Sequence, residues 1–250
     1  MLEQITYNGF SGGLCTINSG EKCLPNQLQE ASNVIIKKNG IVAKRHCSKL
    51  VSDFGAGGEI NAVSEKIGDF YYASTLNKIY AISPSASVVV NVLTKNASGR
   101  FVMFDSLVYT NGEEAMIVVG VGSVLGSPLS KTLVKHNDRA FCSTANVLYE
   151  TAPGTYPSST VDNFATGASW TIGESTSHIV GLIPIGKNLL IFKEKEIFIQ
   201  YGYTKNERQT QLLTKNYGSL SAFSIKSANI QGFGDCAIFL SDKKRLCIAN

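Results

Sequence analysis

The sequence lacks any apolar run long enough to cross a membrane. Its longest apolar stretch, Ala115–Leu125, is interrupted by Gly120 and Gly122 and is much shorter than the roughly 20 residues that span a bilayer. Residues 1–10 also lack the basic start and apolar core of a secretory signal, since Glu3 and several polar residues occupy them. We therefore expect no membrane anchor, assembly in the cytoplasm, and a buried strand at Ala115–Leu125.

Histidine is scarce, with three residues in the chain: His46, His136 and His178. His46 and His136 lie beside basic or turn residues, and His178 follows a Ser-Thr-Ser run. A Ser-His-Asp triad could be assembled from them only because serine and aspartate are abundant, and none has the strand-and-elbow context that such a motif requires. The histidines therefore give no support to a hydrolase.

Phosphate-binding loops and paired catalytic carboxylates are missing as well. The glycines at 55–58 and 120–122 precede neither a helix nor a Lys-Ser/Thr pair, so we interpret them as bends between strands. The acidic pairs Glu113–Glu114 and Glu194/Glu196 lie at or beside expected hairpin turns, where charged side chains are ordinarily solvated. We predict that the chain has no catalytic activity and needs no cofactor.

The six cysteines do not form a metal-binding pattern. Cys15, Cys23, His46 and Cys47 could supply four zinc ligands, but seven residues separate the first pair, whereas a usual zinc knuckle leaves about two to four. A domain of this size also folds without disulfides. We therefore interpret the cysteines as free buried thiols and predict no metal site.

Charge is low and evenly spread. The 23 Lys and Arg residues against 19 Asp and Glu give a net charge of +4, and 17% of all residues are charged. The lysines are scattered through turns and form no basic run, so composition gives little support to nucleic-acid binding. With 44% apolar residues among 250, the chain can bury a substantial core as one β domain or two small ones.

Short apolar segments separated by turn residues fill most of the chain, and helical periodicity is almost absent, which predicts an all-β protein. The clearest hairpin is Asn33–Lys44, where Asn39-Gly40 suits a two-residue type I′ turn because both positions tolerate positive φ. A second candidate turn, Asn111-Gly112, separates Leu107–Tyr109 from Ala115–Val119.

One pattern recurs five times: a Gly, Asn or Asp bend, a short apolar segment, a polar turn and a second apolar segment. Equivalent bend residues are 36, 33, 50 and 47 positions apart, close to the about 40 to 50 residues of a four-stranded propeller blade. The bend residues are Asp69, Asp105, Asp138, Asn188 and Asp235, and the paired segments are 67–74 with 79–82, 104–109 with 115–119, 136–143 with 147–149, 185–192 with 196–199, and 233–240 with 246–248.

The repeat predicts a β-propeller of about five blades over residues 33–250, preceded by an irregular N-terminal arm over residues 1–32. One small sheet cannot bury both of its faces, and radial stacking lets each sheet cover the next. Pairing of N-terminal with C-terminal strands in one composite blade would remove open sheet edges. A β-sandwich, or an arc completed elsewhere, stays open as an alternative.

The order of several segments resembles a family of phage virion proteins, the tail nozzle and tail-accessory (head-completion and stabilisation) proteins of short-tailed phages. In that family a glycine pair and leucine precede an Glu-Ala-x-Asn-Val element, a hairpin and later an Asn-Asp-Arg segment. This chain departs from the pattern at Val147–Glu150, where a serine is expected after the tyrosine. The matching segments are Gly12–Leu14, Leu24–Val34, Asn39–Arg45, Lys135–Arg139, Asp162–Gly167 before Trp170, and Ile179–Phe198.

The resemblance implies a structural virion protein rather than an enzyme. Its members are β-propeller components that lie below the portal and adaptor rings, often as a six-fold nozzle through which DNA leaves the particle. On this basis we expect a homo-oligomeric ring in the phage tail, a hexamer by analogy, assembled in the host cytoplasm and in transient contact with genomic DNA.

A carbohydrate-binding or glycosidase-like propeller is the alternative. Hydrolysis would need two acids about 5 to 10 Å apart near the axis, and the only repeated acids are the bend aspartates, which we interpret as turn formers. A cluster of acids beside Trp170 or tyrosines would favour the glycan function, and a packed axis would favour a scaffold.

Contacts between subunits are expected from the arm and from one long connection. Residues 1–32 mix glycines with isolated apolar residues such as Leu14 and cannot form a core. The connection Thr151–Ser177 exceeds ordinary loop length and carries Tyr156, Phe164 and Trp170. We predict that these four side chains form interfaces, with ordinary core as the alternative for Trp170.

Overall fold

The chain forms two compact units, Met1–Leu50 and Val51–Asn250, in the computed structural model. The structure describes residues 34–36, 42–44 and 59–249, except 85, 96, 175 and 233. The division falls at residues 50 and 51, not at the predicted 32 and 33, because the first hairpin belongs to the N-terminal unit. The interface candidate Leu14 and the ligand candidates Cys15, Cys23, His46 and Cys47 lie outside the described residues.

The first hairpin pairs β1 (Val34–Ile36) with β2 (Val42–Lys44) in an antiparallel two-stranded sheet. The strands are those predicted, but the register pairs Ile36 with Val42. A two-residue turn at Asn39-Gly40 would pair Ile36 with Ala43. The observed register differs from this by one residue, so the predicted two-residue turn is wrong. The turn residues themselves lie outside the described residues.

The described residues of the second unit form five antiparallel sheets, numbered here 1 to 5 in chain order. Sheet 1 is β3 (Ala62–Val63), β4 (Tyr71–Ser74), β5 (Lys78–Ile82) and β6 (Ser87–Val92); sheet 2 is β7 (Arg100–Met103), β8 (Leu107–Thr110), β9 (Ile117–Val118) and β10 (Gly122–Ser123). Sheet 3 is β11 (Thr132–His136), β12 (Arg139–Thr144), β13 (Val147–Glu150) and β14 (Ala168–Thr171); sheet 4 is β15 (Ile179–Ile185), β16 (Asn188–Lys193), β17 (Ile197–Tyr201) and β18 (Gln209–Thr214). Sheet 5 is β19 (Lys226–Ile230), β20 (Gly234–Leu240) and β21 (Leu246–Ala249), preceded by the 3-10 helix η3 (Ala222–Ser224).

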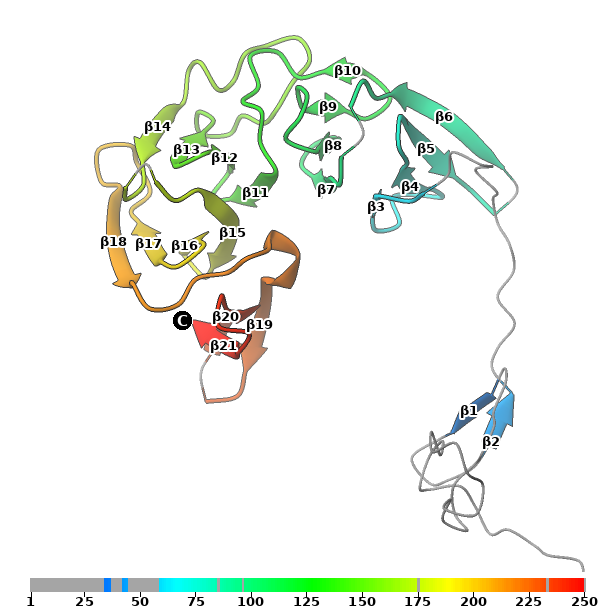
Figure 1. The fold of residues 1–250 in the computed structure, drawn as a ribbon. Coiled ribbons are helices and arrows are strands. Elements are labelled where there is room, and N and C mark those ends of the chain that lie inside the picture. The colour runs from blue at the N-terminus through cyan, green and yellow to red at the C-terminus, as the bar shows by residue number, and fades with distance from the viewer. Residues whose placement is uncertain are drawn as a thin grey trace, which may run out of the picture. The chain divides into compact units, whose positions relative to one another are not determined.

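The five sheets follow one another along a curve, with the first strands of sheets 1 to 4 on its inner side and the last strands on its outer side (Figure 1). The first strand of each sheet contacts the first strand of the next. Each predicted repeat corresponds to the second and third strands of one sheet, from β4 and β5 to β20 and β21. The all-β radial arrangement expected from the repeat is therefore present.

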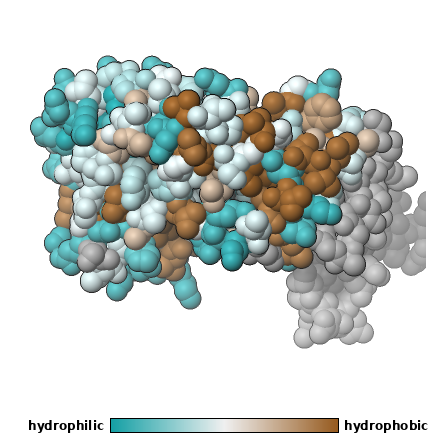
Figure 2. Space-filling model, turned by 90° about the horizontal axis from the view of Figure 1, so that it is seen from above, coloured by the Kyte–Doolittle hydropathy of each residue, from teal (hydrophilic) through white to brown (hydrophobic). Residues whose placement is uncertain are grey.

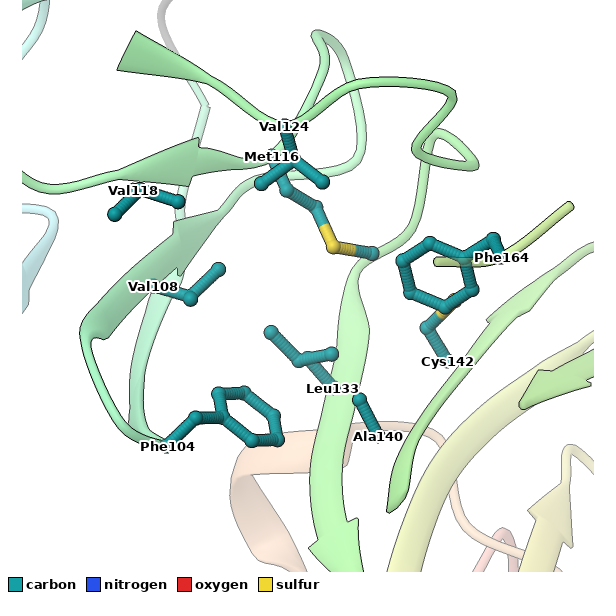
Figure 3. Packing of buried hydrophobic residues seen from close by; sticks show 9 residues of the cluster. All are labelled: Phe104, Val108, Met116, Val118, Val124, Leu133, Ala140, Cys142 and Phe164. Atoms are coloured by element: carbon teal, nitrogen blue, oxygen red, sulfur yellow. The ribbon is translucent and has the colours of Figure 1, made fainter. Parts of the chain in front are cut away.

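Four hydrophobic clusters fill the spaces between consecutive sheets. The cluster between sheets 2 and 3 contains Val108, Met116 and Leu133 together with Phe164 from a connection (Figure 3). Adjacent residues of one strand serve opposite clusters: Leu189 and Ile191 of β16 face sheet 3, whereas Leu190 and Phe192 face sheet 5. Successive side chains of a strand point to opposite faces, so a central strand that is apolar throughout joins two neighbours.

The outer strand of sheet 1 exposes an apolar surface. Val88, Val89 and Val92 of β6 are 59%, 42% and 68% exposed, and Figure 2 shows apolar residues gathered over this part of the chain.

The expectation of a buried strand at Ala115–Leu125 holds in part. Residues Met116–Val118 are buried, but Val121 at the β9–β10 turn and Leu125 are exposed.

The second predicted turn, Asn111-Gly112, belongs to a longer connection between β8 and β9. Asn111 is fully buried, and its Oδ1 accepts hydrogen bonds from the backbone amides of Glu113 and Glu114. Its Nδ2 donates to Glu114 Oε1 at 2.9 Å. Gly112 has a φ of +79°, a left-handed conformation that glycine adopts without steric cost.

The connection Thr151–Ser177 is shorter than predicted, because it contains β14. This strand pairs with β13, and Leu148 lies opposite Trp170. Phe164 is 9% exposed and belongs to the core between sheets 2 and 3. Its side chain therefore lies inside the protein and not on the surface, where a predicted interface residue would have to lie.

We predict that Phe192→Ala lowers the free energy of unfolding by about 3 to 5 kcal/mol, because it removes a ring from the core between sheets 4 and 5. Phe192 is 0% exposed and its ring centroid lies 4.9 Å from that of Phe239. Urea denaturation measures the change. The control, Leu129→Ala at a position 50% exposed, should change stability by about 0.5 kcal/mol or less. Equal effects of the two variants would contradict the assignment of this core.

Candidate functional site

The first candidate site is a cleft of about 400 Å³ lined by the first strands of sheets 1 to 5. Its walls are largely apolar and include Phe101, Val134 and Ile183. Arg100 of β7 is half-buried there, and its guanidinium carbon lies 6.0 Å from the Phe223 ring centroid. Burial lowers the pKa of Arg100 below its ordinary value. Among the described residues that line this cleft, none is a carboxylate.

The repeated bend aspartates do not gather at this axial cleft. Asp69 and Asp138 lie in the tight turns after the first strands, and Asp138 has a φ of +56°. Asp105 lines a separate cleft with Tyr156. Asp235 lies in β20, where its Oδ1 accepts a hydrogen bond from Asn229 Nδ2 at 2.7 Å. Asp69, Asp105 and Asp138 lie in turns or bends, as expected for turn formers. The expectation is wrong for Asp235, which lies within β20.

A buried ionic network lies between sheets 3 and 4. Arg139 begins β12, Glu150 ends β13, and Arg208 immediately precedes β18. Arg139 Nη1 donates to Glu150 Oε1 at 2.6 Å, and Arg208 Nη2 lies 2.9 Å from Glu150 Oε2 without hydrogen-bond alignment. The three residues are 4%, 1% and 8% exposed. One carboxylate therefore holds two guanidinium groups that come from different sheets.

Aromatic rings enclose this network. The Arg208 guanidinium carbon lies 4.8 Å from the Phe141 ring centroid and 6.0 Å from that of Trp170. Arg139 lies 5.6 Å from the ring of Tyr203. Burial raises the pKa of Glu150, and the positive charges of Arg208 and Arg139 oppose that rise. The arginines stay protonated, so the cluster carries a net positive charge. Its contacts with Glu150 link the two sheets.

A second buried cation, Lys193, holds the connection between the same two sheets. It is 0% exposed, and its Nζ donates to the carbonyl oxygens of Ile172 at 2.7 Å and Glu174 at 2.8 Å. Burial lowers the pKa of Lys193, and the charges of Glu196 and Glu174 oppose that change. In the sequence Lys193 directly precedes Glu194, beside an expected hairpin turn. No local signal distinguishes Lys193 from Lys195, because the burial of Lys193 depends on the distant segment that contains Ile172 and Glu174.

The remaining predicted residues are dispersed. His136 is 5% exposed and its Nε2 lies 3.0 Å from Asn137 Nδ2, whereas His178 is exposed. Cys142, Cys236 and Cys247 are free thiols, and burial raises the pKa of Cys142. Within the described ranges, no three His, Cys, Asp or Glu side chains are close enough to hold a metal ion. No helix in the same residues is long and apolar enough to span a membrane.

Three predicted interface residues fall within the described ranges, Tyr156, Phe164 and Trp170, and all three lie in or against the core. Tyr156 is half-buried, with its ring 5.3 Å from Phe104 and 4.4 Å from Lys135 Nζ. Trp170 is half-buried against the cluster between sheets 3 and 4. A role in subunit contacts stays a prediction for these two side chains, which keep partial exposure.

Comparison with known proteins shows the fold. No family model and no curated protein matches the chain. A catalytically inactive variant of virginiamycin B lyase from Staphylococcus aureus, solved with quinupristin, is 14% identical with a TM-score of 0.53, covering 89% of this chain and 75% of that one. The extracellular domain of BT4673 from B. thetaiotaomicron is 12% identical with a TM-score of 0.53, covering 81% and 28%. The fold is a β-propeller.

The N-terminal domain of Nup159 is also similar, at 10% identity and a TM-score of 0.49. The match covers 76% of this chain and 60% of the Nup159 domain. The prediction of an all-β propeller is confirmed. At these identities the similarity concerns the fold alone, since propellers host unrelated functions.

We predict that Glu150→Gln lowers the free energy of unfolding by about 3 to 5 kcal/mol, because two buried guanidinium groups lose their counter-charge. The matched control is Glu113→Gln, which breaks the exposed 3.5 Å ion pair with Lys131 and should cost about 1 kcal/mol or less. Urea denaturation at neutral pH measures both. A Glu150→Gln variant as stable as the control would show that the network does not hold sheets 3 and 4.

We also predict a loss of stability at acidic pH that depends on His136. Burial, followed by the charge of Arg208, lowers the pKa of His136 in the folded protein. As pH falls, this histidine therefore binds a proton at about pH 6.5 in the unfolded chain and at a lower pH in the folded protein. Stability is lost as pH falls from that value to the folded pKa, by at most about 1.4 kcal/mol per pH unit.

Denaturation between pH 7.5 and 5.5, both on the order of one unit from the reference pKa, measures this slope. His136→Gln should reduce the pH dependence, and the matched control His178→Gln, at an exposed position, should leave it unchanged. An unaltered slope in His136→Gln would assign the effect to other groups.

Proposed function

We propose that this chain is a non-enzymatic structural protein of a bacteriophage tail, in which the propeller serves as an assembly module of the nozzle or connector ring. The axial cleft is the observation that carries the proposal. Its described lining has Phe101, Val134 and Ile183 with the cation Arg100 and no carboxylate. Glycoside hydrolysis requires two acidic groups about 5 to 10 Å apart, so this lining favours a scaffold over the glycosidase alternative.

The use of buried charge also supports a scaffold. Glu150 holds Arg139 and Arg208, and Lys193 is bonded to the chain between sheets 3 and 4. These contacts link sheets 3 and 4 to one another. Removing one partner of such a buried group is costly, so these contacts favour one fixed arrangement of sheets 3 and 4.

The proposed partners follow from the resemblance to tail nozzle and tail-accessory proteins. They are further copies of this chain in a six-fold ring, the portal and adaptor proteins above it, and genomic DNA in transit. In this proposal the chain is located in the virion tail and is assembled in the host cytoplasm.

Electron microscopy of phage particles from cells that produce this chain tests the proposal. We expect antibodies raised against the purified protein to label the tail, and a reconstruction to show propeller density in a ring below the portal. Purified protein should show no glycosidase or peptidase turnover. Absence of the chain from the particle, or turnover abolished by Asp105→Asn or Asp235→Asn, would refute the proposal.

A further inference from the structure

Arg100, the first residue of β7, is a cation without an anionic partner among the described residues. Its guanidinium forms no ion pair with them and donates no hydrogen bond to them, and it lies 6.0 Å from the ring centroid of Phe223. This differs from Arg139 and Arg208, which both contact the carboxylate of Glu150. Burial lowers the pKa of Arg100, and removing a charge from water is costly unless an opposite charge lies beside it. The position is therefore suited to an anion.

Arg100 lines the axial cleft, whose volume is about 400 Å³. The first strands of all five sheets contribute to this cleft, and those of sheets 1 to 4 lie on the inner side of the curve (Figure 1). Lys226 is the one other cation in the described lining, which contains no acid. The apolar walls include Val63, Phe101, Val134, Ile183 and Phe223. Small-molecule pockets typically have about 300 to 1,000 Å³ and largely apolar walls with a few polar groups that fix the orientation of the ligand.

The lining also defines the chemistry of a ligand. A guanidinium is a planar fork of N–H donors that matches the two oxygens of a carboxylate. The apolar and aromatic walls, among them Phe101 and Val134, require an apolar body. One half-buried guanidinium balances one negative charge, whereas a phosphate ester carries about −1.5 to −2 at neutral pH. Lys226 is exposed and therefore contributes less, so a monocarboxylate fits better than a phosphate.

We propose that the axial cleft binds a small organic monocarboxylate, with the carboxylate paired to Arg100 and an apolar body against Phe101, Val134 and Ile183. This goes beyond the proposed structural function, because it adds a ligand site to the propeller. A ligand in this cleft contacts first strands of several sheets, so its binding would favour one arrangement of those sheets.

Calorimetric titration of the full-length protein at neutral pH with four probes tests the proposal. The first probe is naphthaleneacetate, which has one carboxylate and an aromatic body. The second, naphthaleneacetamide, keeps the body and removes the charge, and acetate keeps the charge and removes the body. Naphthyl phosphate replaces the carboxylate by a phosphate ester.

We expect naphthaleneacetate to bind at one site per chain. The amide should bind about 10- to 100-fold more weakly, because it loses a charge-assisted hydrogen-bonded pair. Acetate should also bind at least about 10-fold more weakly, because it buries no aromatic surface.

Variants of Arg100 locate the site. Arg100→Gln should weaken naphthaleneacetate by about 10- to 100-fold and leave the affinity for the amide unchanged. Arg100→Lys should give an intermediate affinity, because it keeps the charge and loses the fork. The matched control is Arg245→Gln, at an exposed arginine outside the cleft, which should bind like wild type. Circular dichroism checks that each variant is folded.

Four results would overturn the proposal: no binding of naphthaleneacetate to wild type, equal affinities of wild type for the acid and the amide, unchanged affinity in folded Arg100→Gln, or tighter binding of naphthyl phosphate, which would assign the cleft to phosphate. The comparison of acid with amide uses wild type alone, so it decides the matter even where a variant does not fold. These affinities are measured on purified protein and do not depend on the particle. They can therefore fail while tail labelling succeeds, and the reverse also holds.

Discussion

Apolar packing between successive sheets is the interaction on which the rest of this propeller depends. A small sheet has two faces to bury, and in β12 and β16 neighbouring residues face opposite directions into different clusters. Phe141 faces sheet 4 while Ala140 and Cys142 face sheet 2. Each middle sheet is therefore stabilised by both neighbours. No sheet of this size can bury both faces by itself, so radial order follows from the strand pattern.

The same principle explains why the two ends of the series differ from its middle. Sheets 2, 3 and 4 are covered on both sides, whereas sheet 1 exposes three valines of β6 and sheet 5 exposes Leu246 and Ile248 at its edge. Exposed apolar surface of this kind is typical of contact regions.

Buried charged groups link sheets 3 and 4. Glu150 joins arginines from β12 and from the connection before β18, and Lys193 bonds the chain that leads from sheet 3 to sheet 4. Their removal one at a time is costly because each partner would stay buried without its counter-charge or acceptor. The axial cleft, by contrast, has Arg100 without a carboxylate in its described lining. The charges are thus placed for holding sheets together, in keeping with the structural role proposed above.

The sequence by itself determined the fold class and the five repeated strand pairs, because alternating apolar residues and tight Asp, Asn and Gly turns are local signals. It also located the hairpin at Val34–Lys44 and the turn or bend positions of Asp69, Asp105 and Asp138. The first and fourth strands escaped prediction, since segments such as Ala62–Val63 and Gly122–Ser123 are too short to show a period. Tertiary structure alone decided that Phe164 is core, that Lys193 is buried and that Arg208 meets Glu150. These outcomes depend on contacts between residues far apart in the chain, and no local pattern encodes which distant segment covers a given side chain.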